Sequence, residues 1–387
     1  MASAPPNKTV AEFFAGIGLM RVGLERAGWR VAFANDIDED KRRMYADHFG
    51  GDADFILKDV HLLKASDIPT IALATASFPC NDLSLAGART GLAGRQSSAF
   101  WGFVDVIKKM GKDRRPPMVL LENVTGFLTS NDGNDFKQAL LALNGLGYAA
   151  DAFIIDAVRF VPQSRQRLFV VGARTKHVSA LNETPGFYES ETRPAALADF
   201  IRWNPGIHWQ IRGLPQLPSS VRRLPEILEE LSPNSRTWWS SERRNYLLNQ
   251  MSQKHRDQAS AMIRGKAVTY GTVFRRVRNG KSMAELRADG IAGCLRTPRG
   301  GSGRQILFAA GHGRFSVRLL TPRECARLMG AGDFNIKVSL HQALFGFGDA
   351  VCVPVIEWIA NNYLNPLWRE QFERERWKRA RRGQSYK

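Results

Sequence analysis

The sequence predicts an α/β fold, with a doubly wound, mainly parallel sheet and a second, smaller and irregular domain. Short apolar runs alternate with helical patterns up to about residue 175. After about residue 185 this periodicity weakens, and Pro, Trp, Ser and Arg become common. Strands that take turns with helices imply crossover connections, and these produce a parallel sheet.

The first domain, residues 1–184, is expected to alternate its elements throughout. The expected strands are 9–14, 29–35, 71–76, 118–121, 153–156 and 168–173. The expected helices are 19–27, 40–48, 100–109 and 135–146. Each strand is a short apolar run, and each helix repeats its apolar residues at helical spacing.

A second domain is expected over 185–317, and regular patterning returns after it. Thr321 is a predicted N-cap, with Pro322 at the first helical position and Glu324 completing a capping box. Residues 350–359 read as another apolar helix. The segment 318–366 is therefore expected to return to the first domain, and 367–387 is a basic tail.

The charge of the chain indicates an anionic partner. Its 387 residues carry a formal net charge of +18, and the basic residues gather in the second domain and the tail. Nucleic acid is the leading candidate, against a basic protein without such a partner. The aromatic residues of the tail suit base stacking, or equally one packed face of a solvated helix. They are Trp368, Phe372, Trp377 and Tyr386.

The cysteines argue against a disulfide framework and against a metal site. Cys80, Cys294, Cys325 and Cys352 are widely scattered, with no CxxC pair, which fits a reducing compartment. The first residues lack the layout of a secretory signal, and no apolar run reads as long enough to span a bilayer. We therefore expect a cytoplasmic protein without a membrane partner and without a metal.

A nucleotide-like site is predicted where the first strand meets the first helix. Phe14-Ala15-Gly16-Ile17-Gly18 combines a tight turn with the free N–H groups of a helix N-terminus. Asp36 ends the second strand, where an acid commonly binds ribose, and Asp59 follows a third apolar segment. These residues favour an unphosphorylated adenosine moiety. A nicotinamide dinucleotide fits this half of the evidence equally.

A catalytic thiol is predicted at the end of the strand 71–76. Pro79 ends that run, and the next residue, Cys80, is aimed outward where a substrate can reach it. Glu122 follows the next strand of the sheet at the same edge, and Arg165 and Arg167 precede another. A core cysteine, a loop acid and two surface charges would explain each residue singly. Their convergence on one sheet edge is difficult to explain as packing.

These residues resemble the DNA (cytosine-5) methyltransferases, of the bacterial or phage modification type. The motifs follow one another in the order typical of that family, and the match covers nearly the whole chain outside 185–317. They are Phe14-Ala15-Gly16-Ile17-Gly18, Phe78-Pro79-Cys80, Glu122-Asn123-Val124, Gln163-Ser164-Arg165-Gln166-Arg167 and Gly348-Asp349-Ala350-Val351. The resemblance implies the fold of S-adenosylmethionine-dependent methyltransferases, with 185–317 as the target-recognition domain.

The resemblance also implies a role for each catalytic residue. Cys80 as thiolate adds to C6 of a cytosine that has been flipped out of the duplex. Glu122, with its neighbour Asn123 in the same motif, acts at N3 and at the exocyclic amine. Arg167 holds the base oxygen, and Arg165 supports the site and a nearby phosphate.

The cofactor implied by the resemblance is S-adenosylmethionine, the methyl donor. Phe14 would stack on its adenine, Asp36 would bind the ribose, and Ile37 would cover the ring. Further residues are expected to line the same pocket. They are Ala15, Gly16, Gly18, Asp59, Val60, Pro79, Ala350 and Val351.

Three positions depart from the family pattern without removing a group that the chemistry needs. Asn81 stands where Gln is usual, Asp349 where Asn is usual, and Leu19 replaces a frequent glycine. The expected function is sequence-specific cytosine-5 methylation of double-stranded DNA, by a monomer that protects a genome beside a separate cognate restriction endonuclease. An RNA cytosine-5 methyltransferase and a catalytically silent DNA-binding protein are the alternatives. The basic loop 296–304 suits a DNA groove or a phosphate clamp equally.

Overall fold

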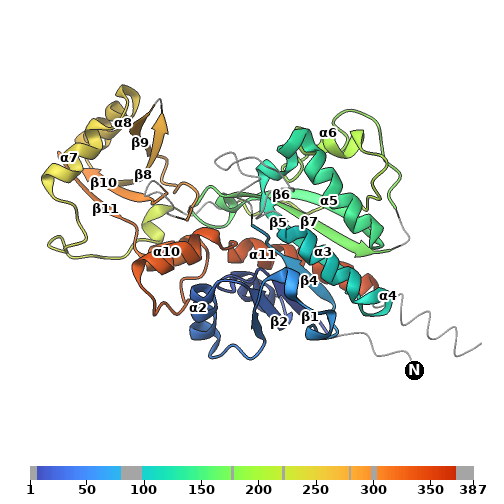
Figure 1. Cartoon of the computed structure of the whole chain (residues 1–387). Helices are drawn as coiled ribbons and strands as arrows, with labels where there is room; N and C mark the ends of the chain where they lie inside the picture. The colour runs from blue at the N-terminus through green and yellow to red at the C-terminus, as the bar shows by residue number, and fades with distance from the viewer. Residues whose placement is uncertain are drawn as a thin grey trace, which may run out of the picture.

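The protein consists of a larger part around a seven-stranded sheet and a smaller part around a four-stranded sheet (Figure 1). The computed structural model describes residues 7–79, 98–175, 178–219, 223–278, 280–297 and 303–371. Cys80 and Asn81 lie outside the described residues, as do 298–302 of the basic loop and 372–387 of the tail.

The large sheet has the strand order β3-β2-β1-β4-β5-β7-β6. Its five strands from β3 to β5 are parallel, whereas β7 is antiparallel to both of its neighbours. The strands are β1 (Thr9–Phe13), β2 (Arg30–Asp36), β3 (Phe55–Leu57), β4 (Leu73–Ala76), β5 (Met118–Val124), β6 (Tyr148–Asp156) and β7 (Gln166–Arg174). The predicted α/β class with a mainly parallel sheet is confirmed.

Helices cover both faces of this sheet, and each face has its own hydrophobic core. One core holds α1 (Leu19–Arg26), α2 (Glu39–Phe49) and α11 (Val353–Ile359) against the sheet. The other holds α3 (Ala99–Lys109) and α5 (Asn134–Gly145). The remaining short helical elements are α4 (Gly111–Arg114), η1 (Val60–Leu62), η2 (Ala65–Asp67), η4 (Thr125–Gly133), η5 (Ala157–Arg159) and η6 (Leu224–Glu226).

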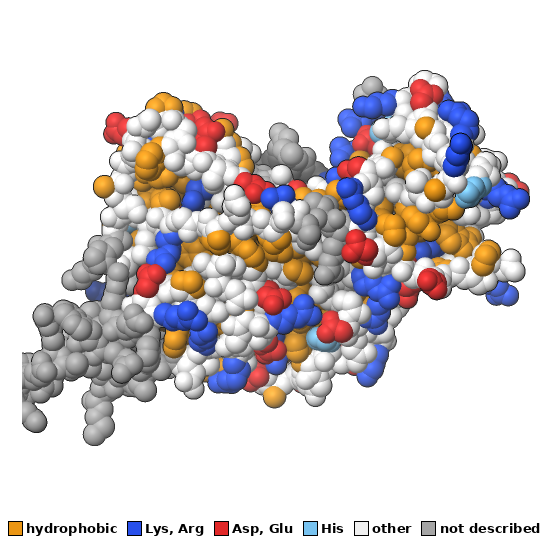
Figure 2. Space-filling model, turned by 180° about the vertical axis from the view of Figure 1, so that it is seen from behind, with side chains coloured by type: hydrophobic (Ala, Val, Ile, Leu, Met, Phe, Trp, Pro, Cys, Tyr) orange, Lys and Arg blue, Asp and Glu red, His pale blue; other side chains and the backbone are white. Residues whose placement is uncertain are grey.

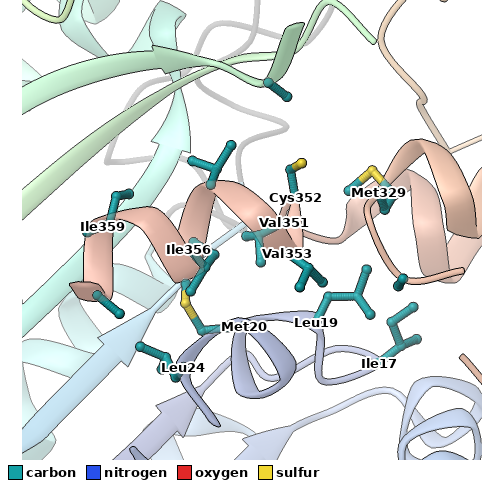
Figure 3. Close-up of a cluster of buried hydrophobic side chains, with 14 of the residues drawn as sticks. Ile17, Leu19, Met20, Leu24, Met329, Val351, Cys352, Val353, Ile356 and Ile359 are labelled. Carbon is teal, nitrogen blue, oxygen red and sulfur yellow. The ribbon is translucent and has the colours of Figure 1, made fainter. Parts of the chain in front are cut away.

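The C-terminal helices pack directly on the first helix of the chain. In Figure 3, Met20 and Leu24 of α1 point toward Ile356 of α11. The backbones come so close that a Cβ on Gly23 would lie 2.7 Å from the Cβ of Ile356. The return of the chain after residue 318 therefore completes the core of the large sheet.

The capping box predicted before this segment is present. The hydroxyl of Thr321 accepts from the N–H of Glu324, whose carboxylate accepts from the N–H of Thr321. This box starts α9 (Pro322–Leu328), which α10 (Leu340–Asp349), α11 and the π-helical turn η7 (Ala360–Leu364) follow. The helix predicted over 350–359 begins later, at Val353, because Pro354 favours the first turn and Ala350 is extended.

One described stretch, which joins α10 to the helical elements after it, is long and apolar enough to cross a membrane by length and composition alone. It is Leu340–Gln371, and 61% of its most apolar window is buried inside the protein. This corrects the expectation that no apolar run reaches that length. The apolar residues of α11 within it contact α1 and the sheet, as expected of a core helix.

The smaller part is an antiparallel sheet of order β11-β10-β8-β9 with a core of its own. Its strands are β8 (Thr269–Arg278), β9 (Lys281–Arg287), β10 (Ile306–Gly311) and β11 (Arg314–Leu319), and its helices are α7 (Ser241–Asn249) and α8 (Gln253–Arg264). By contrast, α6 (Ala195–Trp203) and Trp209 contact the core of the large sheet, although they fall within the predicted second domain.

Candidate active site

The turn after β1 has the backbone geometry of a ligand cradle. Phe14, Gly16 and Gly18 all have positive φ, of 57°, 57° and 84°. Gly18 cannot carry a side chain, since a Cβ there would lie 2.4 Å from the ring of Phe49. No side chain among the described residues caps α1, so the N-terminus of this helix presents its N–H groups to the turn.

Asp36 is fixed beside this turn by three backbone donors. Its carboxylate accepts hydrogen bonds from the N–H groups of Gly16 (2.8 Å), Ile37 (2.8 Å) and Asp38 (3.0 Å). These bonds tie the end of β2 to the cradle after β1. An oriented carboxylate of this kind suits a pair of ribose hydroxyls.

The other predicted adenosine residues surround the same strand ends. Ile37 leaves 68% of its surface exposed, which suits a residue that covers a ligand ring. Asp59 caps η1 through the N–H of His61, and Val60 is buried behind it. Phe14 is half-buried against the core beneath the turn. The set therefore fits an adenosine cofactor by chemistry and placement.

Sequence reasoning missed Glu12, a buried acid in β1. No side chain that the structure describes donates a hydrogen bond to its carboxylate oxygens. Burial raises the pKa of Glu12 to about 8, although Arg21 lowers it in part. Its partner across the parallel ladder is Thr75, whose buried hydroxyl likewise meets no partner in the described part. The sequence signal that could have identified Glu12 is the presence of an acidic residue inside an otherwise apolar strand.

The strand that leads to Cys80 is held from the side by β5. Asn123 is buried, and its amide donates to the backbone carbonyl of Phe78 at 3.1 Å. Asn123 also accepts from the N–H of Val124 through its Oδ1, which orients the amide. The chain is thus anchored two residues before Cys80, and Pro79 is exposed at the edge of the described segment.

Glu122 and Arg167 form an ion pair at the same edge of the sheet. The Nε of Arg167 lies 3.0 Å from Oε1 of Glu122, with the two side chains 17% and 8% exposed. A cleft is lined by this pair together with Arg165, Phe169 and Val351. The acid and one predicted base-binding guanidinium therefore meet in one small cleft.

Arg165 is buried and binds backbone carbonyls. Its guanidinium donates to the carbonyls of Leu295 (2.8 Å), Gly348 (3.2 Å) and Ala350 (2.6 Å). It is 3% exposed, so it joins the segment between β9 and β10, the end of α10 and the catalytic edge rather than reaching outward for a phosphate. The supporting part of its predicted role fits this placement, and the phosphate part does not.

Cys294 is a second thiol at this site that the sequence reasoning left without a role. Its Sγ lies 3.2 Å from Nη1 of Arg165. Burial raises the pKa of Cys294, but the cations of Arg165 and Arg167 outweigh burial, so the pKa lies below its usual value. The basic loop follows directly, and the backbone of Thr297 lies against Gly348.

The described residues contain no group of three His, Cys, Asp or Glu side chains arranged to hold a metal ion. The polar groups of the site suit an organic cofactor and a base. The carboxylate of Asp36 faces the cradle after β1, and a carboxylate–guanidinium pair faces the cleft beside β5.

Residues 8–365 match the family described as C-5 cytosine-specific DNA methylase. The chain is 29% identical over 356 residues to the type II methyltransferase M.DsaV of Dactylococcopsis salina, covering 92% of this chain and 85% of that protein. It is 28% identical to M.HaeII of Haemophilus aegyptius, covering 93% of each.

Solved structures share the fold. The Dnmt2 methyltransferase of S. pombe superposes with a TM-score of 0.62 at 20% identity, covering 93% of this chain and 98% of that chain. A putative DNA modification methyltransferase encoded within an E. coli prophage superposes with a TM-score of 0.52 at 20% identity, covering 92% and 98%. With the family match over nearly its whole length, the chain belongs to the C-5 cytosine-specific DNA methylases and is a DNA cytosine-5 methyltransferase that uses S-adenosylmethionine.

Proposed function

We propose that this protein methylates a cytosine within a specific sequence of double-stranded DNA, as the modification enzyme of a restriction–modification system. The observation that carries this proposal is the Glu122–Arg167 pair, which lies beside the strand leading to Cys80. In this proposal the enzyme acts as a cytoplasmic monomer, and its cognate endonuclease is a separate protein.

The cradle residues hold the cofactor in this proposal. Asp36 binds the ribose, Phe14 and Ile37 flank the adenine, and Asp59 and Val60 meet its edge. Further contacts come from Ala15, Gly16, Gly18, Pro79, Ala350 and Val351. S-adenosylmethionine supplies an electrophilic methyl group on a sulfonium. The protein's own task is to orient that group toward the cleft and to exclude water.

The reaction begins with the bond between Cys80 and C6 of the flipped cytosine. Glu122 donates a proton or hydrogen bond to N3, so that the electron pair released by the thiolate collects at C5. Arg167 holds both Glu122 and the base oxygen. C5 would take the methyl group, which leaves the cofactor as the thioether S-adenosylhomocysteine. A base would then remove the proton from C5, and the electron pair of that C–H bond would re-form the C5–C6 double bond and expel Cys80 as thiolate.

Duplex DNA is the proposed substrate because the smaller sheet carries a basic, aromatic surface. Figure 2 shows Lys and Arg side chains on the smaller lobe. Within it, Arg243 stacks over Trp239 at 3.9 Å, and Arg276 stacks over Phe274 at 4.7 Å. Phosphate contacts from such residues offset the cost of flipping a base, which is a few kcal/mol. A large basic domain suits the groove of a duplex, where the edges of the bases are read, and this favours DNA over RNA, the second candidate.

Bisulfite sequencing of DNA from cells that express the chain tests this function. We expect methylcytosine at one position of a recurring sequence, and none with Cys80→Ser. In vitro, labelled methyl groups should enter duplex DNA and not structured RNA. A fluorinated cytosine duplex with cofactor should trap the protein through residue 80. Methyl transfer to RNA alone, or full activity of the Cys80→Ser protein, would overturn the proposal.

A further inference from the structure

An ion pair connects two helices across the cofactor cradle. Lys41 lies in the first turn of α2, and Asp349 is the last residue of α10. The Nζ of Lys41 lies 2.9 Å from Oδ2 of Asp349, and the side chains are 20% and 42% exposed. The helices approach closely at Gly346, where a Cβ would lie 2.9 Å from the sulfur of Met44. The pair thus lies beside a tightly packed contact between α2 and α10, but it remains open to solvent.

This pair lies at the turn that follows β1. The Cδ of Lys41 is the nearest heavy atom to the place that a Cβ on Gly16 would occupy, at 4.0 Å. Gly16 is the residue whose N–H binds Asp36. On the other side, Asp349 directly precedes Ala350 and Val351, which line the predicted cofactor pocket. The pair therefore borders the cradle from both helices.

The surroundings of each charge favour a ligand with the opposite charge. Asp349 lies at the C-terminus of α10, where the helix dipole disfavours a carboxylate and a neighbouring cation offsets it. Burial lowers the pKa of Lys41, but Asp349 and Asp36 outweigh burial and hold Lys41 charged. The N-terminus of α1 beside them attracts an anion. The next residue after Asp349, Ala350, has no polar side chain that could bind such a ligand.

The amino-acid end of S-adenosylmethionine carries a carboxylate and an ammonium on one carbon. Such a zwitterion matches a lysine and an aspartate whose charged atoms lie 2.9 Å apart. We propose that Lys41 binds the cofactor carboxylate and Asp349 its ammonium, exchanging their own contact for two contacts with the ligand. This inference rests on the proposed function, because it assumes the cofactor named there, and it assigns two residues to the end opposite the adenine.

Calorimetric binding to the full chain tests this assignment with two ligands. S-adenosylhomocysteine contains the amino-acid end, whereas 5′-methylthioadenosine lacks it and keeps the adenosine and the sulfur. We expect Lys41→Met to weaken S-adenosylhomocysteine about tenfold, the worth of one charge-assisted contact, and to leave methylthioadenosine unchanged. Asp349→Asn should act in the same direction but less strongly, because the amide still accepts a hydrogen bond.

The matched control is the ion pair of Lys109 with Asp105 on α3, since both of its partners are exposed. Lys109→Met should change neither affinity. Equal weakening of both ligands by Lys41→Met would overturn the assignment and leave a purely structural clamp, and so would unchanged affinity for both. If the wild-type chain bound neither ligand, the proposed cofactor itself would be wrong, a failure visible before any variant is made.

Discussion

The Nε of Arg167 lies 3.0 Å from Oε1 of Glu122, and this contact is a consequence of strand register. In the antiparallel pairing of β5 with β7, Val124 lies opposite Arg167, so the guanidinium arrives next to the end of β5. A parallel β7 would have placed these residues at the opposite edge. The one strand that runs against its neighbours on both sides therefore delivers a cation to the catalytic acid.

Replacing Glu122 by Gln should abolish most methyl transfer while preserving the site. The amide keeps the size of the side chain and a contact with Arg167, but it cannot deliver a proton to N3. We expect the rate to fall by about 10²- to 10⁴-fold, the usual contribution of general acid–base catalysis. Single-turnover transfer of labelled methyl groups measures the rate. Binding of S-adenosylhomocysteine should stay unchanged, and a loss of that binding would show damage beyond the acid.

Replacing Asn123 by Ala should loosen the start of the segment that contains Cys80. The variant leaves the buried carbonyl of Phe78 without its donor, at a cost of about 1–3 kcal/mol. We expect the thermal midpoint to fall by a few degrees and methyl transfer to fall about tenfold. Asn144→Ala is a control, because that amide also binds a backbone carbonyl but lies in α5 beside the start of β6, at the opposite edge of the sheet. Equal loss of methyl transfer in both variants would contradict a local role for Asn123.

The elements of the large sheet could be predicted because its strands are buried and its helices amphipathic. One error falls where polar residues serve the site. The strand predicted over 118–121 continues to Val124, since Glu122 and Asn123 remain paired with β7 despite their polarity. In the smaller part, Arg275, Arg276 and Arg278 lie along β8 and hide its alternation, so that a regular sheet reads as an irregular segment.

The site residues themselves could be predicted from motif order, but their contacts could not. Lys41 and Asp349 are 308 positions apart, and only the packing of α2 on α10 brings them together. Arg165 and Arg167 are another example, because two arginines that lie two residues apart look equivalent in the sequence. One is enclosed by carbonyls, and the other faces Glu122. Tertiary burial decided this difference.

The pH dependence of stability should report on Glu12. Burial raises its pKa in the folded protein to about 8, above the ordinary value of 4.5. The folded state thus binds more protons than the unfolded state between these two values. The contribution of Glu12 is therefore most favourable below pH 4.5, declines as the pH rises, and is lost above about pH 8.

Thermal unfolding of the wild type and of Glu12→Gln across this range tests the assignment. The glutamine does not ionise, so the variant should lack this part of the decline. We expect the thermal midpoint of the variant, measured relative to that of the wild type, to be about 5 °C higher at pH 8 than at pH 5. Parallel curves would mean that Glu12 is charged throughout in the folded protein. Asp105→Asn, which removes an exposed acid paired with Lys109 on α3, is the control.

The ion pair of Arg318 with Glu324 should be the strongest single link between the small sheet and the C-terminal helices. The two nitrogens of Arg318 lie 2.7 and 2.5 Å from the two carboxylate oxygens of Glu324, and the side chains are 1% and 0% exposed. Glu324 also closes the capping box of α9 with Thr321. Removing the cation alone leaves a buried carboxylate uncompensated.

Arg318→Met should therefore lower the free energy of unfolding by about 3–5 kcal/mol, measured by urea denaturation of the full chain. The double variant Arg318→Met with Glu324→Gln should recover part of this loss, because it removes the unpaired charge. Arg314→Met changes an exposed arginine of the same strand and should lower stability by less than about 0.5 kcal/mol. If the two single arginine variants unfolded at the same urea concentration, the buried pair would not be the link that its geometry indicates.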